Sequence, residues 1–160
     1  MSNDLIYTNP MTGSHVLIKR HVWETISRFT NDDEIKVEAG GVFIGCYRGP
    51  HVEITDCTVP FPGDNRLRML FDRKDPMHQK KTHSLWRNSK QTKTYVGEWH
   101  THNELVPSPS GLDRRTWDDV QQRFAFGGRP LFFMILGKNN NWAGNANGYK
   151  LALNKQAKDL

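Results

Sequence analysis

The run LFFMILG at residues 131–137 places six large apolar side chains in succession. Successive side chains of a β-strand point to opposite faces of the sheet, so a strand without any polar position must be covered on both sides. Strands of this kind lie inside a sheet that has further layers of structure above and below it. The run therefore predicts a central strand in a layered domain.

The rest of the chain alternates between helical and extended patterns. Apolar residues at 18, 22, 23, 26 and 29 form one helical stripe, and segments rich in β-branched and aromatic residues are typical of strands. Asp75-Pro76 supplies an N-cap and a first-turn proline for a basic helix at about 73–90. Helices interleaved with a mixed sheet predict a single α/β (α+β) domain over residues 1–160. The predicted strands are 37–47, 51–61, 66–72, 94–102, 131–137 and 141–151, and the predicted helices are 18–29, 75–89 and 110–124.

Composition limits the setting in which the chain works. Hydrophobic residues make up 36% of the sequence, which is enough for a packed core. The sequence has no apolar run long enough to span a bilayer, and the start MSNDLIYTNP lacks the features of a signal peptide. Cys46 and Cys57 form no C-x-x-C pair, so we expect two reduced thiols. We therefore expect a cytoplasmic protein with no membrane partner.

Positive charge is concentrated in one segment. Residues 66–93 contain nine Lys or Arg residues and two Asp residues, a local balance of +7, whereas the whole chain carries +5. Such a segment is either a solvated helix face or a surface for a nucleic acid or an acidic protein. Only Phe71 and Trp86 could act there as stacking platforms for bases, so we expect no nucleic acid partner.

The segment GEWHTHNELVPSPSGLD at residues 97–113 carries the strongest chemical signal. His100 and His102 share one face of the predicted strand and lie about 7 Å apart along it, close enough to bind one metal ion. Asp113 falls on the first turn of the next helix, in the row of Trp117, Val120 and Phe124, which we expect to face inward. Two histidines and one carboxylate leave a tetrahedral zinc with one open position for water, the pattern of a catalytic zinc site.

Each part of this segment also has an ordinary interpretation. H-x-H in a strand is often incidental, and S-x-x-D at the start of a helix is a common capping box, here with Ser110 as N-cap and Asp113 at N3. The combination is less easily explained by chance than either part alone. The separate elements therefore have to be considered together.

Together they resemble a known family. The pattern His100-x-His102, seven residues, Ser110, two residues, Asp113 resembles the complete motif of the JAMM (MPN-type) metalloproteases, and Glu38 in VEAGGVFIG matches the glutamate that this family places before a glycine-rich turn. The resemblance covers roughly residues 15–137 and implies the JAMM/MPN, cytidine-deaminase-like fold. The motif looks most like that of small bacterial members found in anti-phage CBASS operons beside a cyclic-oligonucleotide synthase.

The resemblance implies a role for each motif residue. His100, His102 and Asp113 would bind one catalytic Zn²⁺, Glu38 would be the general base, and Ser110 would donate a hydrogen bond to the oxyanion. The residues alone do not select Glu38. Glu98 shares the strand face of the histidines and competes for that role, and Glu53 and Glu104 are weaker competitors.

One position departs from the family pattern. Many members carry a proline directly after the second histidine, where this chain has Asn103. That position shapes the following loop and binds no metal, so the departure bears on substrate fit.

The expected activity is hydrolysis of the amide bond after the C-terminal residue of a conjugated protein. The partner would be a protein whose extended C-terminal tail is joined to a lysine or another amine, in the CBASS-like case the cyclase itself. Two alternatives remain open: a peptidase that processes a ubiquitin-like or sulfur-carrier protein, and a non-catalytic MPN scaffold or basic binding module.

Overall fold

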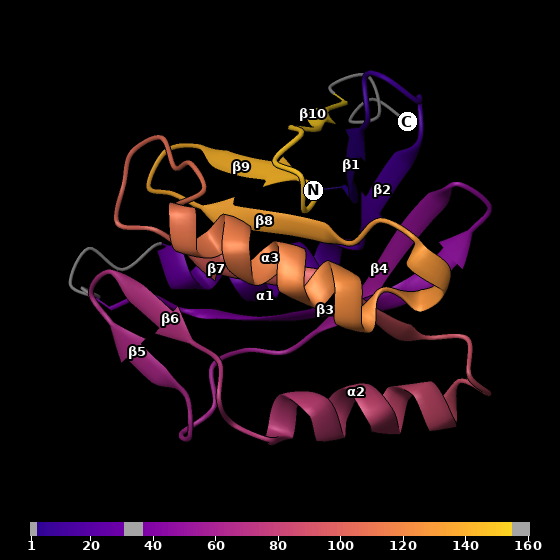
Figure 1. Ribbon diagram of the computed structural model, residues 1–160, viewed down its shortest axis with the longest axis horizontal. Coiled ribbons are helices and arrows are strands. Elements are labelled where there is room, and N and C mark those ends of the chain that lie inside the picture. Colours follow the sequence, from indigo (N-terminus) through magenta and orange to yellow (C-terminus); the bar gives the residue numbers. More distant parts are fainter. Residues whose placement is uncertain (1–2, 31–36, 155–160) are drawn as a thin grey trace.

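A large mixed sheet is the framework of the chain in the computed structural model, which describes residues 3–30 and 37–154 (Figure 1). The eight strands are β1 (Leu5–Thr8), β2 (His15–Ile18), β3 (Gly40–Arg48), β4 (His51–Cys57), β7 (Thr94–Thr101), β8 (Phe132–Leu136), β9 (Asn141–Gly144) and β10 (Ala152–Leu153). Three neighbouring strands near the centre, β4, β3 and β7, have seven to nine residues, and the others have five or fewer.

The sheet is strongly curled. The strand order is β10-β1-β2-β4-β3-β7-β8-β9, with parallel pairing between β2 and β4 and between β7 and β8. After β9 the chain crosses to the opposite edge of the sheet, where β10 pairs with β1, and the Leu151 N–H donates to the Ala143 carbonyl on the way. The two edges therefore approach each other, and the concave side of the sheet encloses most of the core.

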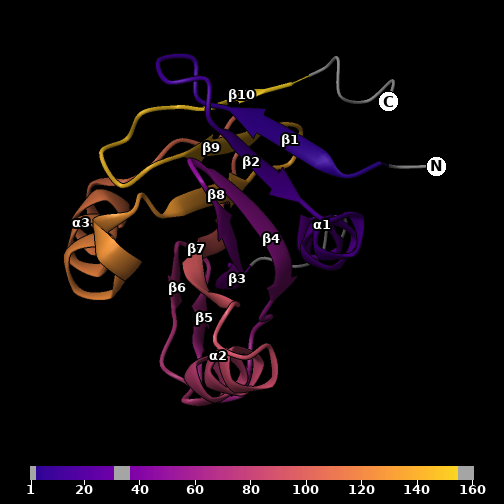
Figure 2. The same ribbon diagram turned by 90° about the vertical axis from the view of Figure 1, so that its right-hand side faces the viewer.

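Helices cover both sides of this sheet. In Figure 2, α1 lies on one side and α3 on the other, with α2 beneath. None of the helices in the described part of the chain is long and apolar enough to cross a bilayer. The helices are α1 (Arg20–Ser27), α2 (Met77–Asn88) and α3 (Gly111–Phe124), with short 3₁₀ turns at Arg28–Thr30 and Phe126–Gly128.

The apolar run 131–137 lies as predicted between two packed layers. In β8, Phe132 and Met134 belong to the cluster on the concave side, whereas Phe133 and Ile135 belong to the cluster beneath α3. All five residues of the strand are buried. The strand is next to the sheet edge rather than central in order, because only β9 lies beyond it.

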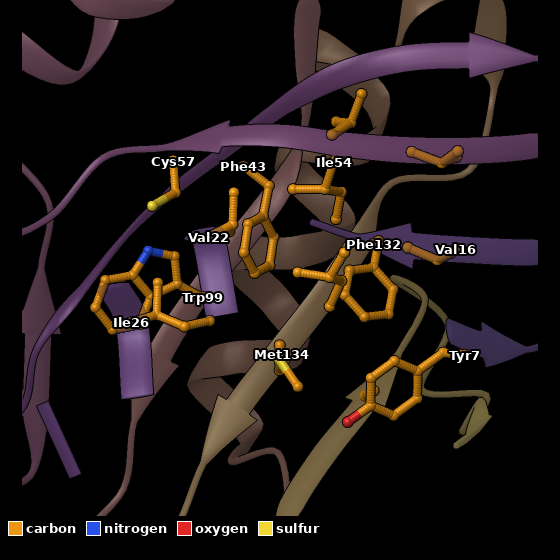
Figure 3. Packing of buried hydrophobic residues seen from close by; sticks show 14 of the residues in the cluster. Tyr7, Val16, Val22, Ile26, Phe43, Ile54, Cys57, Trp99, Phe132 and Met134 are labelled. Atoms are coloured by element: carbon orange, nitrogen blue, oxygen red, sulfur yellow. The ribbon is translucent and has the colours of Figure 1, made fainter. Parts of the chain in front are cut away.

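The concave cluster fixes the strands that carry the candidate site. Trp99 on β7, Phe43 on β3 and Ile26 on α1 are each at most 1% exposed and lie together in Figure 3. The Trp99 indole N–H also donates to the Thr58 carbonyl, 2.9 Å away. Burial of each large apolar side chain contributes about 1.5–3 kcal/mol, so this cluster holds β3 and β7 in a defined register.

The predicted strand 66–72 is wrong in detail. The segment forms a hairpin of β5 (Asn65–Leu67) and β6 (Leu70–Asp72), which is a second sheet separate from the first. The chain reverses at Arg68 and Met69, which a single extended pattern does not reveal. The predicted strand 141–151 is also too long: it contains β9, which ends at Gly144, and β10 begins only at Ala152, beyond the predicted range.

The first third of the chain also differs from the prediction. Strands β1 and β2 were not predicted, because they are only four residues long. Ile18, assigned to the first helix by its stripe, ends β2, and α1 begins two residues later. Pro76 rather than Asp75 is the N-cap of α2, although the Asp75 carboxylate still accepts a hydrogen bond from the Met77 N–H.

The inward stripe predicted for α3 is correct except at its end. Trp117 and Val120 are buried, and Trp117 stacks on Phe133 at 4.7 Å between ring centroids. Phe124 is 58% exposed, because it is the last residue of the helix and meets only the edge of the Tyr95 ring.

Candidate active site

The two histidines lie at the C-terminal end of β7. His100 is paired with Gly40 of β3 and with Ile135 of β8, and His102 follows one residue after the strand ends. The i and i+2 spacing puts both rings on one face, as predicted. Their Nε2 atoms are 3.1 Å apart, and the side chains are 13% and 10% exposed.

Asp113 reaches the histidines from the first turn of α3. Its Oδ1 lies 3.2 Å from His100 Nε2, and its Oδ2 lies 3.2 Å from His102 Nε2. The capping box is also present: the Ser110 Oγ accepts from the Asp113 N–H, and the Ser110 N–H donates to Asp113 Oδ2. The capping interpretation and the metal interpretation are therefore both compatible with one geometry, because the cap orients the carboxylate toward the rings.

These three side chains suit a single metal ion. Their ligand atoms all lie within 4.8 Å of one another. With ligand bonds of about 2.0–2.1 Å, the corners of a tetrahedron around zinc lie about 3.3 Å apart, close to the observed 3.1 and 3.2 Å. Two nitrogens and one oxygen are three protein ligands, the number that a catalytic zinc site uses when a water molecule is the fourth.

The charges of the triad respond to one another. Burial raises the pKa of the Asp113 carboxyl, but hydrogen bonds from His100 and His102 outweigh it and hold this pKa well below its usual range. Burial lowers the pKa of His102, but the Asp113 carboxylate, with Glu38 and Glu104 behind it, leaves that pKa raised. Carboxylates that stabilise a protonated histidine in this way can also stabilise a bound metal cation.

Glu38 lies beside the triad, in the same cleft. It is 6% exposed. The predicted strand 37–47 included Glu38, but β3 begins only at Gly40, two residues later. Burial raises the pKa of its carboxyl, against the opposing effect of His102 and His100. A carboxylate whose pKa is raised toward neutrality is a more effective general base.

The competing glutamates have other partners. Glu98 accepts hydrogen bonds from Arg73 and from the Tyr95 hydroxyl, so its charge is already compensated. Glu53 pairs with Arg48 away from the cleft. Glu104 is about half exposed, and its carboxylate is 3.6 Å from His102 Nδ1, beyond hydrogen-bond distance.

The cleft around these groups has a volume of about 520 Å³. The β5–β6 hairpin forms one of its walls with Arg68, Met69 and Phe71. The basic helix α2 contributes no residue to the lining, so the basic segment divides into a hairpin that faces the cleft and a helix that does not.

Sequence reasoning missed the hairpin's contacts with the site. The Leu67 carbonyl accepts from the Glu38 N–H, and Arg66 Nε donates to the Glu38 carbonyl. The Asn103 side chain, at the position that departs from the family pattern, donates to the Arg68 carbonyl at the hairpin tip. No spacing rule connects these positions, since they are about 30 residues apart in sequence and meet only through folding.

The cleft of this mixed sheet brings together three side chains that could bind one metal ion, a hydroxyl and a buried carboxylate. This combination is typical of metallohydrolases. The sequence matches the family described as prokaryotic homologs of the JAB domain over residues 19–148, and the chain belongs to this family. It is thus a JAMM-type peptidase, and the family resemblance and the fold class inferred from the motif are confirmed.

Individual relatives agree with this assignment. The chain is 37% identical over 116 residues to a protein of Pseudomonas aeruginosa named CD-NTase/cGAS isopeptidase, covering 72% of this chain and 73% of the relative. It is 33% identical over 142 residues to an Escherichia coli protein of the same name, covering 89% and 88%. The solution structure of protein DSY2949 from Desulfitobacterium hafniense shares the fold, with a TM-score of 0.59 at 16% identity over 86% of this chain and 88% of that one.

Proposed function

We propose that this chain is a zinc-dependent isopeptidase that removes a cyclic-oligonucleotide synthase (CD-NTase) from the proteins to which it has been conjugated, in anti-phage defence. The observation that carries the proposal is the convergence of His100, His102 and Asp113 beside Glu38 in one cleft. Relatives that cover most of the chain are named for action on CD-NTase/cGAS, which supports this choice of substrate. The bond cleaved is the amide that follows the C-terminal residue of the conjugated protein.

In this proposal His100, His102 and Asp113 hold one Zn²⁺, which when bound supplies Lewis-acid polarisation and acidifies a water molecule. Glu38 takes the proton from the attacking water and delivers it to the departing amine, because its buried carboxyl has a raised pKa. The Ser110 Oγ accepts from the Asp113 N–H, which leaves the hydroxyl hydrogen to donate to the oxyanion.

The substrate would approach along the hairpin. Leu67 and Met69 are 55% and 86% exposed at the hairpin tip, and Arg68 lies beside them in the cleft lining. An extended C-terminal tail can add to the free edge of such a hairpin by backbone hydrogen bonds and rest side chains on its apolar residues. We therefore expect this hairpin wall of the cleft to bind the extended C-terminal tail of the substrate rather than its folded domain.

A trapping experiment tests the proposal. Glu38→Ala should keep the metal ligands and stop turnover, so conjugates should accumulate on the protein in cells that carry the cyclase and its conjugating enzyme, and mass spectrometry would identify them. Glu53→Ala is the matched control, because it removes a glutamate outside the cleft and should clear conjugates like the wild type.

The identity of the trapped material decides between the possible functions. A cyclase C-terminus joined to lysine, present with Glu38→Ala and lost with wild type, supports the proposal. A ubiquitin-like or sulfur-carrier C-terminus in its place would indicate the processing peptidase. The same uncleaved partners on both proteins would indicate a scaffold without activity.

A further inference from the structure

The position of Glu38 depends on the β5–β6 hairpin. The Glu38 N–H donates to the Leu67 carbonyl at 2.7 Å, and Arg66 Nε donates to the Glu38 carbonyl at 3.0 Å. The Phe71 N–H donates to the Glu38 carboxylate. The Phe71 ring also fills the space in front of Gly40, where a Cβ would lie 2.4 Å from it. The hairpin therefore holds both the backbone and the carboxylate of this glutamate.

The hairpin itself needs an anchor. Within the described residues, β5 and β6 pair only with each other. A two-stranded hairpin is marginally stable alone in water, so its position must be set from outside. One attachment is at the tip, where Asn103 donates to the Arg68 carbonyl at 2.8 Å.

A single buried carboxylate joins the two ends of the hairpin. Asp64 Oδ1 accepts from the N–H groups of Lys74 and Asp75, each at 2.9 Å. Its Oδ2 accepts from the Phe61 N–H at 2.9 Å and from His78 Nε2 at 2.6 Å. The segment that enters the hairpin, the segment that leaves it and the first turn of α2 therefore meet at one side chain.

His78 connects this carboxylate to the main sheet. Its side chain is 1% exposed, and its Nδ1 lies 2.6 Å from Thr58 Oγ1. The Asp64 carboxylate can only accept, so His78 Nε2 carries the proton that faces it. In a ring with one proton, Nδ1 then accepts from the Thr58 hydroxyl, whose oxygen accepts from the Val42 N–H of β3. Hydrogen bonds therefore run in one direction from β3 through Thr58 and His78 to Asp64, which also accepts from the segments at both ends of the hairpin.

We propose that Asp64 and His78 are positioning residues for Glu38. This inference rests on the proposed function, in which Glu38 is the general base. Neither residue lines the cleft, so neither touches substrate or metal. They act by fixing the ends of the hairpin against β3, and the hairpin in turn holds Glu38 in line with His100 and His102. Loss of the pair should lower turnover more than substrate binding.

The test compares His78→Phe with two other variants, on full-length protein loaded with Zn²⁺. His78→Phe keeps a buried ring and removes both hydrogen bonds. His78→Gln keeps a donor toward Asp64 and is the conservative rescue. Ile18→Ala is the matched control, because it opens a cavity at β2, a strand that contributes no residue to the cleft, and destabilises the fold generally.

We expect His78→Phe to lower kcat at least tenfold, with any rise in KM smaller than the loss of kcat, and His78→Gln to recover most of the loss. Amide hydrogen exchange should accelerate at Glu38 and across residues 64–75, whereas zinc affinity should stay unchanged. Ile18→Ala should lower Tm at least as much and leave kcat near the wild-type value below its melting range.

Four results would overturn the inference. They are an unchanged kcat in His78→Phe, a change confined to KM, an equal loss of kcat in Ile18→Ala, and unchanged exchange at Glu38. The exchange measurement needs no substrate. If the wild type cleaves no conjugate, the proposed function fails, while exchange at Glu38 still decides whether Asp64 and His78 fix the hairpin.

Discussion

Ser110 is expected to have two separable functions, one in stability and one in catalysis. As the N-cap of α3, its Oγ accepts from the Asp113 N–H at 3.0 Å. Its hydroxyl hydrogen is the proposed oxyanion donor. Ser110→Ala removes both functions. Ser110→Gly also removes the hydroxyl, but glycine is nearly as good an N-cap as serine, so the two variants differ chiefly in stability.

The magnitudes follow from these contacts. Alanine at this cap should cost about 1 kcal/mol, whereas glycine should cost a few tenths. For a chain of 160 residues, 1 kcal/mol lowers Tm by about 2–4 °C. Loss of one oxyanion donor lowers kcat by about 10²–10³. Because Ser110 is exposed and would share the task with the metal, we expect a value near 10² in both variants.

The assay measures kcat and KM on a purified conjugate, with Tm and bound zinc recorded for each variant. The expected result is an equal loss of kcat in Ser110→Ala and Ser110→Gly, with full zinc content in both and a lower Tm only in Ser110→Ala. If Ser110→Gly keeps its activity while Ser110→Ala loses it, the loss comes from a displaced Asp113, and the oxyanion role is refuted. Full activity in both variants would refute it equally.

Four further predictions follow from the site and its surroundings. Glu38→Gln should lower kcat by about 10²–10⁴ and Glu98→Gln far less, measured side by side; the reverse order would identify Glu98 as the base. A chelator should abolish activity and lower Tm, and added Zn²⁺ at a hundred times its Kd should restore about 2.7 kcal/mol of stability, measured by calorimetry. Burial raises the pKa of Asp64, but hydrogen bonds from Phe61, Asp75 and His78 leave it lowered. Asp64→Asn should therefore lower the free energy of unfolding by about 1–3 kcal/mol at pH 7. The difference from wild type should narrow as the pH falls below about 3.9 and through the lowered pKa of the folded state. Urea titrations at several pH values would measure this difference. Lys80→Glu/Arg87→Glu should raise KM for a protein substrate but not for a short peptide, because both side chains are exposed on α2 outside the cleft; equal effects would show that α2 does not dock the substrate.

Much of the fold and of the candidate site can be predicted from the sequence, because the patterns involved are local. The two-residue period of a strand puts His100 and His102 on one face, and the capping box aims Asp113 at the start of α3. The apolar run in β8 predicts two covered faces. Local backbone geometry fixes which side of a strand or helix each of these side chains occupies. These predictions therefore do not require knowledge of the residues that pack against them.

Only the tertiary structure distinguishes the two glutamates that compete for the role of base. By spacing, Glu98 shares the face of the histidines, but folding brings Arg73 and Tyr95 to it and leaves Glu38 beside the triad. Glu38 reaches that place through the register of Gly40 with His100 and through a hairpin that a strand pattern did not reveal. Both depend on contacts between residues far apart in sequence, which are selected by the packing of the whole core and leave no periodic signal in the chain.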